Sequence, residues 1–489
     1  MLRFVFHYGG LLLLGIVVLH FISVVLAIVS ERREPSATVA WLMTVTFLPV
    51  VGVILYYALA RTRFRRQFRK REEKLGQAEE ALSFYVQQQV ADFDRALEGL
   101  RPEEQGLIQL AANSAASPGG GAPFVGNAVE RYADGAAKFE ALMAAIRSAR
   151  SHIHLEYYIV RPDETGTAVR DLLVEKAKAG VEVRFLYDGI GSLGLHRRGF
   201  FGELVEAGGE VEAFLPLRIS KILERVNFRN HRKIAVIDGR VGFLGGMNIG
   251  DEYAGRRPEY GGWRDSHLRI EGPAVAELQH VFLTDWLFTT NQTVADPQYF
   301  PDIEAAGDEL VQIVASGPGC RWPTIQHLFF QAINTAERQV LIVTPYFVPD
   351  RSVLMALESA ALRGLDVRLL LPSRTDHRMV TSAARSYYEE LLESGVRIFE
   401  YQTGYLHSKT ISVDGRYGSV GSANMDVRSF TLNFEASAFV YSARFAEGLR
   451  RQFLEDSDRA EEIELERFRG RPRIKRFGQS LAQLLSPVL

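Results

Sequence analysis

The chain has 489 residues, of which 47% are hydrophobic and 24% are charged, so it is a folded protein and not a disordered chain. Its length exceeds one ordinary hydrophobic core, and we expect two or more domains. The formal net charge is −2, and the single cysteine, Cys320, excludes an intramolecular disulfide and favours a reducing compartment.

The first elements are two apolar runs. Residues 4–29 are almost entirely apolar, and residues 37–60 contain no charge. Each run is long enough for a membrane helix, which needs about 20 apolar residues. We therefore predict a transmembrane hairpin over residues 1–60. A cleaved signal peptide is the alternative for the first run, but a second run follows at once. Pro49 inside the second run predicts a kink or a re-entrant shape.

A basic cluster follows the second run. Residues 61–74 hold eight arginines and lysines against two glutamates. The positive-inside rule places this segment in the cytoplasm, so we expect a multi-pass protein of the cell (inner) membrane with its catalytic part on the cytoplasmic side. The cluster also predicts contact with anionic membrane lipids.

The charge of the chain is distributed unevenly. Residues 1–74 carry 11 Lys and Arg against 4 Asp and Glu, a net of +7, which leaves −9 for the remainder of a chain whose total is −2. A domain that holds a nucleic-acid backbone normally carries the opposite sign. We therefore expect no nucleic-acid partner.

The next segment predicts a connector. Residues 77–106 have a polar helical pattern, and residues 117–123 form a loop rich in glycine and proline. With the basic cluster they make a juxtamembrane segment and helical linker over residues 61–125.

Beyond the loop, the same order of elements occurs twice. A strand, a helix ending at a glycine and a second strand are expected at 152–159, 167–179 and 181–187, and again at 339–343, 352–363 and 365–371. Strands alternating with helices predict a layered α/β fold in each half, over 126–305 and 306–489.

A spaced motif is also duplicated, with every internal spacing identical. The first copy is His231, Lys233, Asp238, Gly245 and Asn248, and the second is His407, Lys409, Asp414, Gly421 and Asn424. Each copy begins on a predicted strand that ends in an Asp-Gly turn. Because side chains alternate across a strand, each His and Lys project from the same face. A hairpin after the turn would return the Asn beside them.

These residue types suit phosphoryl chemistry. One imidazole can attack phosphorus while a second acts as general acid and then base. The two lysines and two asparagines supply positive charge and hydrogen-bond donors for the phosphoryl oxygens. We expect no metal and no other cofactor, because the lysines neutralise that charge and each histidine's same-face partner is not a metal ligand.

The paired H-x-K-x4-D-x6-G-[GS]-x-N motifs resemble the phospholipase D superfamily. Segments 32–41 and 49–52 resemble the start of bacterial cardiolipin synthases, as do segments 263–267, 315–318, 432–435 and 484–487 further along. The resemblance covers nearly the whole chain. It implies two tandem phospholipase D-like α/β/α sandwich halves with the active site between them.

The resemblance also implies a reaction. One histidine attacks a phosphatidylglycerol to give a phosphatidyl-histidine and glycerol, and a second phosphatidylglycerol takes the phosphatidyl group to form cardiolipin. We expect His231 to be the nucleophile and His407 the acid and base. Lys233, Lys409, Asn248 and Asn424 should hold the phosphate oxygens.

Five further residues have expected roles. Asp238 and Asp414 belong to the motif but are expected as structural anchors. Asp265 and Glu435 are candidates for carboxylates that orient each imidazole. Ser422, which stands where the first copy has Gly246, is a candidate substrate contact.

Alternatives remain open at this point. A phospholipase D-type hydrolase would use the same residues, and the donor of a cardiolipin synthase could be phosphatidylethanolamine. A nuclease is disfavoured by charge, and a non-catalytic scaffold by two intact motifs. The C-terminal amphipathic segment, with Ile474, Phe477, Leu481 and Leu484 on one face, fits an interfacial helix or a helix docked on the core. The oligomeric state is not predicted.

Overall fold

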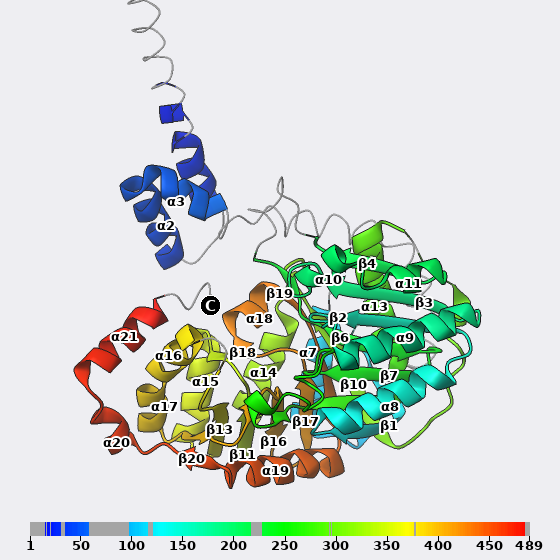
Figure 1. Cartoon of the computed structure of the whole chain (residues 1–489). Helices are drawn as coiled ribbons and strands as arrows, with labels where there is room; N and C mark the ends of the chain where they lie inside the picture. Colours follow the sequence, from blue (N-terminus) through cyan, green and yellow to red (C-terminus); the bar gives the residue numbers. More distant parts are fainter. Residues whose placement is uncertain are drawn as a thin grey trace, which may run out of the picture. The chain divides into compact units, whose positions relative to one another are not determined.

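The computed structural model describes residues 15, 17–19, 21–30, 35–57, 97–115, 121–216, 227–292, 294, 296–375 and 378–484 (Figure 1). The chain forms two compact units, Met1–Gln67 with Leu217–Asn227, and Phe68–Pro216 with Phe228–Leu489. The basic cluster and most of the predicted linker helix lie outside the described residues.

The first unit is helical. Residues 17–19 and 21–30 are helical, and they are followed by α2 (Pro35–Phe47) and α3 (Pro49–Leu55). The described residues contain no helix that combines the length and apolar character needed to cross a bilayer. Much of the first apolar run and the end of the second are not described.

The second apolar run is not the single long helix expected for a span. Leu48 leaves the helical conformation and Pro49 begins α3, because proline fits the first turn of a helix and not its interior. The chain then turns back on itself, so that a Cβ at Gly52 would lie 2.5 Å from the carbonyl oxygen of Thr44. The small core of this unit is formed by Val24, Ile28, Val45 and Tyr56.

The second unit is built on one continuous mixed sheet of 16 strands within the described residues. Its order is β20-β14-β13-β11-β16-β17-β19-β10-β1-β9-β7-β6-β2-β3-β4, with β5 paired to β19. The first-half strands are β1 (Pro123–Tyr132), β2 (His152–Tyr157), β3 (Glu182–Asp188), β4 (Glu210–Phe214), β5 (Arg229–Asn230), β6 (Lys233–Ile237), β7 (Val241–Gly245) and β9 (His267–Glu271). The second-half strands are β10 (Glu309–Ser316), β11 (Gln339–Val343), β13 (Asp366–Pro372), β14 (Arg397–Tyr401), β16 (Thr410–Val413), β17 (Tyr417–Gly421), β19 (Asn433–Tyr441) and β20 (Ala460–Glu462).

The duplication in the sequence is a duplication of topology. In the first half, β2, β3 and β4 are parallel and β6 runs antiparallel to β2. In the second half, β11, β13 and β14 are parallel and β16 runs antiparallel to β11. The expected strands and helices of both halves are present within a few residues of their predicted bounds. The two halves meet where β1 pairs with both β9 and β10.

Helices cover both faces of each half-sheet (Figure 1). The first-half helices are α8 (Gly135–Ser148), α9 (Glu164–Lys178), α10 (Leu193–Arg198), α11 (Gly202–Glu206) and α13 (Val275–Thr290). The second-half helices are α14 (Thr324–Thr335), α15 (Arg351–Leu362), α16 (Arg378–Ser386), α17 (Tyr388–Ser394), α18 (Val427–Thr431), α19 (Ala443–Ser457), α20 (Leu465–Arg469) and α21 (Arg473–Gln483). An earlier helix, α7 (Pro102–Ser114), packs on α14.

Successive side chains of a strand point to opposite faces of the sheet, so each face of the sheet packs into a core of its own. Ala235 and Ile237 of β6 join the core under α8 and α9. Ile234 and Val236 face the opposite way, into a core that also contains Val420 of β17 and other residues of the second half. The two halves therefore share one buried apolar layer, which fixes their relative position and that of the residues at its edge.

Short two-stranded pairings add to the site region. β8 (Trp263–Arg264) pairs with β15 (Tyr405–Leu406), and β12 (Phe347–Val348) pairs with β18 (Met425–Asp426). The first of these pairings joins the two halves directly before His407 in the chain.

Candidate active site

The two motif histidines are held in place by the opposite half of the chain. The backbone N–H of His231 donates to the carbonyl of Phe434 at 2.9 Å, and that of His407 donates to the carbonyl of Arg264 at 2.7 Å. Each histidine lies just before its motif strand, β6 or β16. Neither half could position its own histidine in this way alone.

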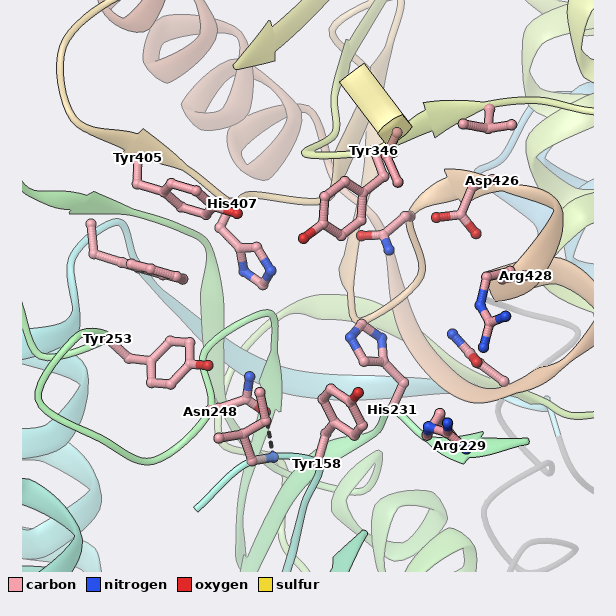
Figure 2. Close-up of a pocket in the computed structure, with 16 residues that line it drawn as sticks. Tyr158, Arg229, His231, Asn248, Tyr253, Tyr346, Tyr405, His407, Asp426 and Arg428 are labelled. Carbon is pink, nitrogen blue, oxygen red and sulfur yellow. Dashed lines mark hydrogen bonds between the residues drawn. The ribbon is translucent and has the colours of Figure 1, made fainter. Parts of the chain in front are cut away.

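Each imidazole also contacts a carboxylate of the opposite half. Nδ1 of His231 lies 3.0 Å from both Oε1 and Oε2 of Glu435, and Nδ1 of His407 lies 2.7 Å from Oδ2 of Asp265. Because a carboxylate only accepts hydrogen bonds, it places the ring proton on Nδ1 and leaves Nε2 as the basic nitrogen. Both imidazoles line one cavity (Figure 2).

The two carboxylates are fully buried, and the cations around them keep them ionised. Although burial opposes ionisation, Lys409 and His407 lower the pKa of Asp265 to about 2. Burial likewise opposes ionisation of Glu435, but His231 and Lys233 lower its pKa below the usual value. Two fixed negative charges therefore lie behind the imidazoles.

The histidines themselves are held neutral. Burial and the charge of Lys409 lower the pKa of His407 to about 4, despite the opposing effect of Asp265. Burial also lowers the pKa of His231, partly offset by Glu435. At neutral pH, and with no substrate bound, both rings are therefore unprotonated at Nε2, which is the state that attack on phosphorus or general-base catalysis requires.

The motif lysines lie beside the histidines. Nζ of Lys233 donates to the carbonyl of His231 at 2.5 Å, and Nζ of Lys409 lies 2.8 Å from Nδ1 and 3.2 Å from Nε2 of His407. Both lysines are buried, and burial lowers the pKa of Lys233 to about 7. Each motif lysine therefore places its ammonium group next to the histidine of the same motif.

The motif asparagines line the cavity itself. Oδ1 of Asn248 accepts from the backbone N–H of Ile159 at 3.1 Å, which fixes the amide and leaves its N–H₂ for donation. Oδ1 of Asn424 is buried without a hydrogen-bond partner in the described structure.

The motif aspartates are not among the residues that line the cavity. Asp238 and Asp414 end their strands in left-handed conformations, with φ of 53° and 55°. Each carboxylate accepts three backbone N–H groups from the start of a neighbouring strand at 2.7–3.0 Å; the donors are Arg150, Ser151 and His152 for Asp238, and Glu337, Arg338 and Gln339 for Asp414. These contacts tie the motif turn to the sheet.

Ser422 does not line the cavity either. Its hydroxyl donates to Oε2 of Glu435 at 2.5 Å, and the side chain is fully buried. The structure therefore places the Ser422 hydroxyl on the carboxylate that contacts His231. At the equivalent point in the first half, a Cβ on Gly246 would overlap with Oδ1 of Asp265, so only glycine fits there.

The cavity has a volume of about 420 Å³ and is lined in part by residues that the sequence analysis did not select. They include Tyr158, Arg229, Tyr253, Trp263, Tyr346, Tyr405, Asp426 and Arg428, beside the histidines and asparagines (Figure 2). One signal was available for two of them, since Arg229 and Tyr405 each precede a motif histidine by two residues. The others come from segments that only the fold brings together.

The two ends of the cavity differ in chemistry. Trp263 stacks on Tyr405 with ring centroids 4.5 Å apart, and its ring centroid lies 5.3 Å from that of His407. Arg229 and Arg428 lie together at the His231 end (Figure 2). In the described part of the chain, no three His, Cys, Asp or Glu side chains are grouped so as to hold a metal ion.

Comparison with known families identifies the fold. A family model described as "Cardiolipin synthase, PLD-like domain" matches residues 142–286 and 329–457, which is more than half of the chain. This chain belongs to the cardiolipin synthase family. It is therefore an enzyme of the phosphatidyltransferase type. A model described as "Phospholipase_D-nuclease N-terminal" matches residues 15–61.

Named members of the cardiolipin synthase family are similar over almost their whole length. The cardiolipin synthase of Geobacillus kaustophilus (strain HTA426) is 43% identical over 470 residues, covering 96% of this chain and 92% of the relative. The major cardiolipin synthase ClsA of Bacillus subtilis (strain 168) is 40% identical over 478 residues, covering 96% and 98%.

A solved structure shares the fold of this cardiolipin synthase family member. The crystal structure of phosphatidylserine synthase from Haemophilus influenzae Rd KW20 matches 79% of this chain and 99% of its own, with a TM-score of 0.58 and 16% identity. The tandem α/β arrangement predicted from the duplicated motif is confirmed by this comparison and by the strand order.

Proposed function

We propose that the chain makes cardiolipin by transferring the phosphatidyl group of one phosphatidylglycerol to the terminal hydroxyl of another. The observation that carries this proposal is the pair of imidazoles in one cavity, each with its Nδ1 on a carboxylate of the opposite half. This arrangement provides one nucleophile and one acid and base at the same phosphorus.

The chemistry follows in two displacements. The histidine that acts as acid first takes up a proton at Nε2, which the anionic phosphodiester bound beside it favours. Nε2 of the other histidine then attacks phosphorus, and the bond from phosphorus to the glycerol oxygen breaks while the protonated histidine donates its proton to that oxygen. The acid histidine, now neutral, takes the proton from the hydroxyl of the incoming phosphatidylglycerol. That oxygen attacks phosphorus, and the phosphorus–nitrogen bond breaks. The sequence-based assignment of His231 as nucleophile and His407 as acid and base stays a prediction.

The remaining motif residues divide into two groups. Lys233, Lys409, Asn248 and Asn424 supply positive charge and N–H donors around the cavity, and we assign them to the phosphoryl oxygens, whose charge grows in the transition state. A second group acts through other residues: Asp238 and Asp414 tie the motif turns, and Ser422 holds Glu435.

The test is reconstitution of the purified full chain in vesicles with phosphatidylglycerol labelled in its glycerol headgroup, with a chelator present. We expect equal amounts of cardiolipin and free glycerol from the wild type, and neither from His231→Ala or His407→Ala. His327→Ala, on α14 and outside the cavity lining, is the matched control.

Two results would contradict the proposal. Phosphatidic acid as the sole lipid product would identify a hydrolase. Cardiolipin carrying the phosphatidyl group of labelled phosphatidylethanolamine, in preference to that of phosphatidylglycerol, would identify a different donor.

We also propose that the chain acts at the cytoplasmic face of the cell membrane, anchored by its N-terminal unit. The helices of that unit expose many large apolar side chains, including Leu19, Leu26, Phe47 and Val50. Exposed apolar side chains gathered on one surface are typical of sites that contact a membrane or another protein. The positive charge of residues 61–74 supports the cytoplasmic side.

A second membrane contact is proposed at α21. Four apolar side chains of this region follow helical spacing and are each more than half exposed: Ile474, Phe477, Leu481 and Leu484. α21 also carries three basic residues and packs on α16, and Val380 of α16 lines the cavity. A helix lying at the lipid surface here would place the cavity next to its substrate.

A further inference from the structure

The duplicated fold allows the two ends of the cavity to be compared position by position. Arg229 stands two residues before His231, and Tyr405 stands two residues before His407, so the two positions are equivalent in the repeat. At the His407 end, Tyr405 is covered by the stacked ring of Trp263. At the His231 end, the equivalent position carries a positive charge instead.

A second arginine from the other half strengthens that charge. Arg229 lies on β5, which pairs with β19, and Arg428 lies on α18, which follows the second motif. Both side chains are partly exposed and line the cavity on the side of His231 (Figure 2). The preceding residue, Phe228, is buried, so the strand turns Arg229 and not its neighbour toward the cavity.

The carboxylates near the pair are stabilised by backbone N–H groups. Asp188 accepts from Ile190, Gly191 and Asn230 at 2.8–2.9 Å. Asp426, which lines the cavity, accepts from the backbone N–H of Ser429 at 2.7 Å, and burial raises its pKa to about 6. Backbone N–H groups therefore stabilise Asp188 and Asp426 in addition to the guanidinium groups of Arg229 and Arg428.

The two arginines also act on each other. Arg229 donates to the carbonyl of Phe228 at 2.7 Å and contacts Tyr158 in the cavity wall. Burial and the neighbouring charge of Arg229 lower the pKa of Arg428, although Asp426 opposes this effect. Two like charges at a cavity wall repel, and an anion bound between them relieves the repulsion.

We propose that Arg229 and Arg428 form a second phosphate site, which binds the phosphodiester of the acceptor lipid while the motif residues hold the phosphoryl group being transferred. This inference rests on the proposed function. The acceptor phosphatidylglycerol carries its own phosphate, joined to the attacking hydroxyl by a short glycerol bridge. Water and simple alcohols carry no such anion, so the pair favours the lipid acceptor over them.

The test measures the choice of acceptor. Wild type, Arg229→Gln, Arg428→Gln and the double variant are reconstituted with phosphatidylglycerol vesicles and a fixed concentration of ethanol, and cardiolipin and phosphatidylethanol are quantified together. We expect the ratio of cardiolipin to phosphatidylethanol to fall by about tenfold for each single variant, which corresponds to about 1.4 kcal/mol of lost acceptor binding. Arg147→Gln, on the exposed face of α8, is the matched control and should keep the wild-type ratio.

An unchanged ratio in the double variant would overturn the inference, whether total turnover falls or not. Equal loss of both products would overturn it as well, because the pair would then serve the donor or the fold. Failure of the proposed function is separate, since it would appear as absence of cardiolipin from the wild type. Lysine at both positions should restore part of the ratio, because the charge returns without the forked geometry.

Discussion

Glu435 in the second half holds Nδ1 of His231 in the first half, with both carboxylate oxygens 3.0 Å from the ring nitrogen. The contact crosses the boundary between the repeats, and Asp265 and His407 make the reciprocal one at 2.7 Å. The orientation of each imidazole therefore depends on a carboxylate from the other half of the chain.

The contact between Glu435 and His231 can be tested by removing its charge. Glu435→Gln lets the wrong tautomer of His231 form, so we expect turnover to fall by a factor on the order of 10³–10⁴, as for the equivalent change in a catalytic triad. The measurement is the initial rate of cardiolipin formation.

The matched variant combines Glu435→Gln with His231→Ala. If Glu435 acts through His231, the double variant should be no slower than His231→Ala alone, because residues that act as a unit are not additive. A further loss would show that Glu435 has a separate role.

The protonation states of His231 and Lys233 predict a pH profile. His231 must be unprotonated at Nε2 to attack phosphorus, and burial lowers its pKa below the usual value of a histidine, so we expect loss of activity only at acidic pH as the pH falls. Lys233 must be charged, and its pKa of about 7 places loss of activity above that value as the pH rises. Cardiolipin formation at limiting substrate should thus follow a bell-shaped curve between these limits.

Lys233→Arg tests the assignment of the alkaline limb. Arginine stays charged throughout this range, so the variant should lose the fall above a pH of about 7 even if its maximal rate is lower. An alkaline limb at the same pH in both proteins would assign it to a different group.

The two repeats differ at one position that follows the motif glycine: the first repeat has Gly246 where the second has Ser422. In Gly246→Ser, the new Cβ would overlap with Oδ1 of Asp265. We expect the free energy of unfolding to fall by about 1–3 kcal/mol, as for overpacking of a core, together with loss of turnover because Asp265 moves from His407. Denaturant unfolding and cardiolipin formation measure the two effects.

Ser422→Gly is the reverse exchange in the second half. It creates no clash and removes one donor from Glu435, so its loss of stability should be smaller, at about 0.5–1.5 kcal/mol. Equal losses of unfolding free energy in the two variants would mean that the close approach of Asp265 to Gly246 is not the reason for glycine at that position.

The exposed apolar face of α21 predicts a dependence on the lipid surface. Replacing Phe477 and Leu481 by serine removes apolar area from the proposed lipid-facing side of the helix. We expect lower activity on long-chain phosphatidylglycerol in vesicles and little change on a short-chain, monomeric phosphatidylglycerol. Val205→Ser, on α11, is the exposed control. Equal losses on both substrates would assign α21 to the stability of the fold.

Much of this architecture could be predicted from the sequence because the duplication exposes it. Matching spacings located both histidines and both lysines, and the strand and helix patterns of the halves follow from the alternation of apolar residues. Asp265 and Glu435 were selected as carboxylates for the imidazoles, and the structure brings each within hydrogen-bonding distance of a motif histidine.

Other features could not be predicted because they depend on tertiary contacts. Pro49 indicated a break, but only packing shows that α2 and α3 fold together instead of forming one helix. Nothing in the sequence indicates that the hydroxyl of Ser422 donates to Glu435, because only the fold brings the two residues together. Arg428 becomes part of a cationic pair only because the fold brings α18 and β5 to the same cavity.

The backbone hydrogen bonds from His231 to Phe434 and from His407 to Arg264 make the proposed catalytic centre dependent on both repeats. A repeat separated from its partner would keep its motif and lose the groups that position its histidine. Substitutions in one repeat must therefore be compatible with the other. A substitution of Asp265, for example, would remove the carboxylate that contacts His407, 142 positions away in the chain.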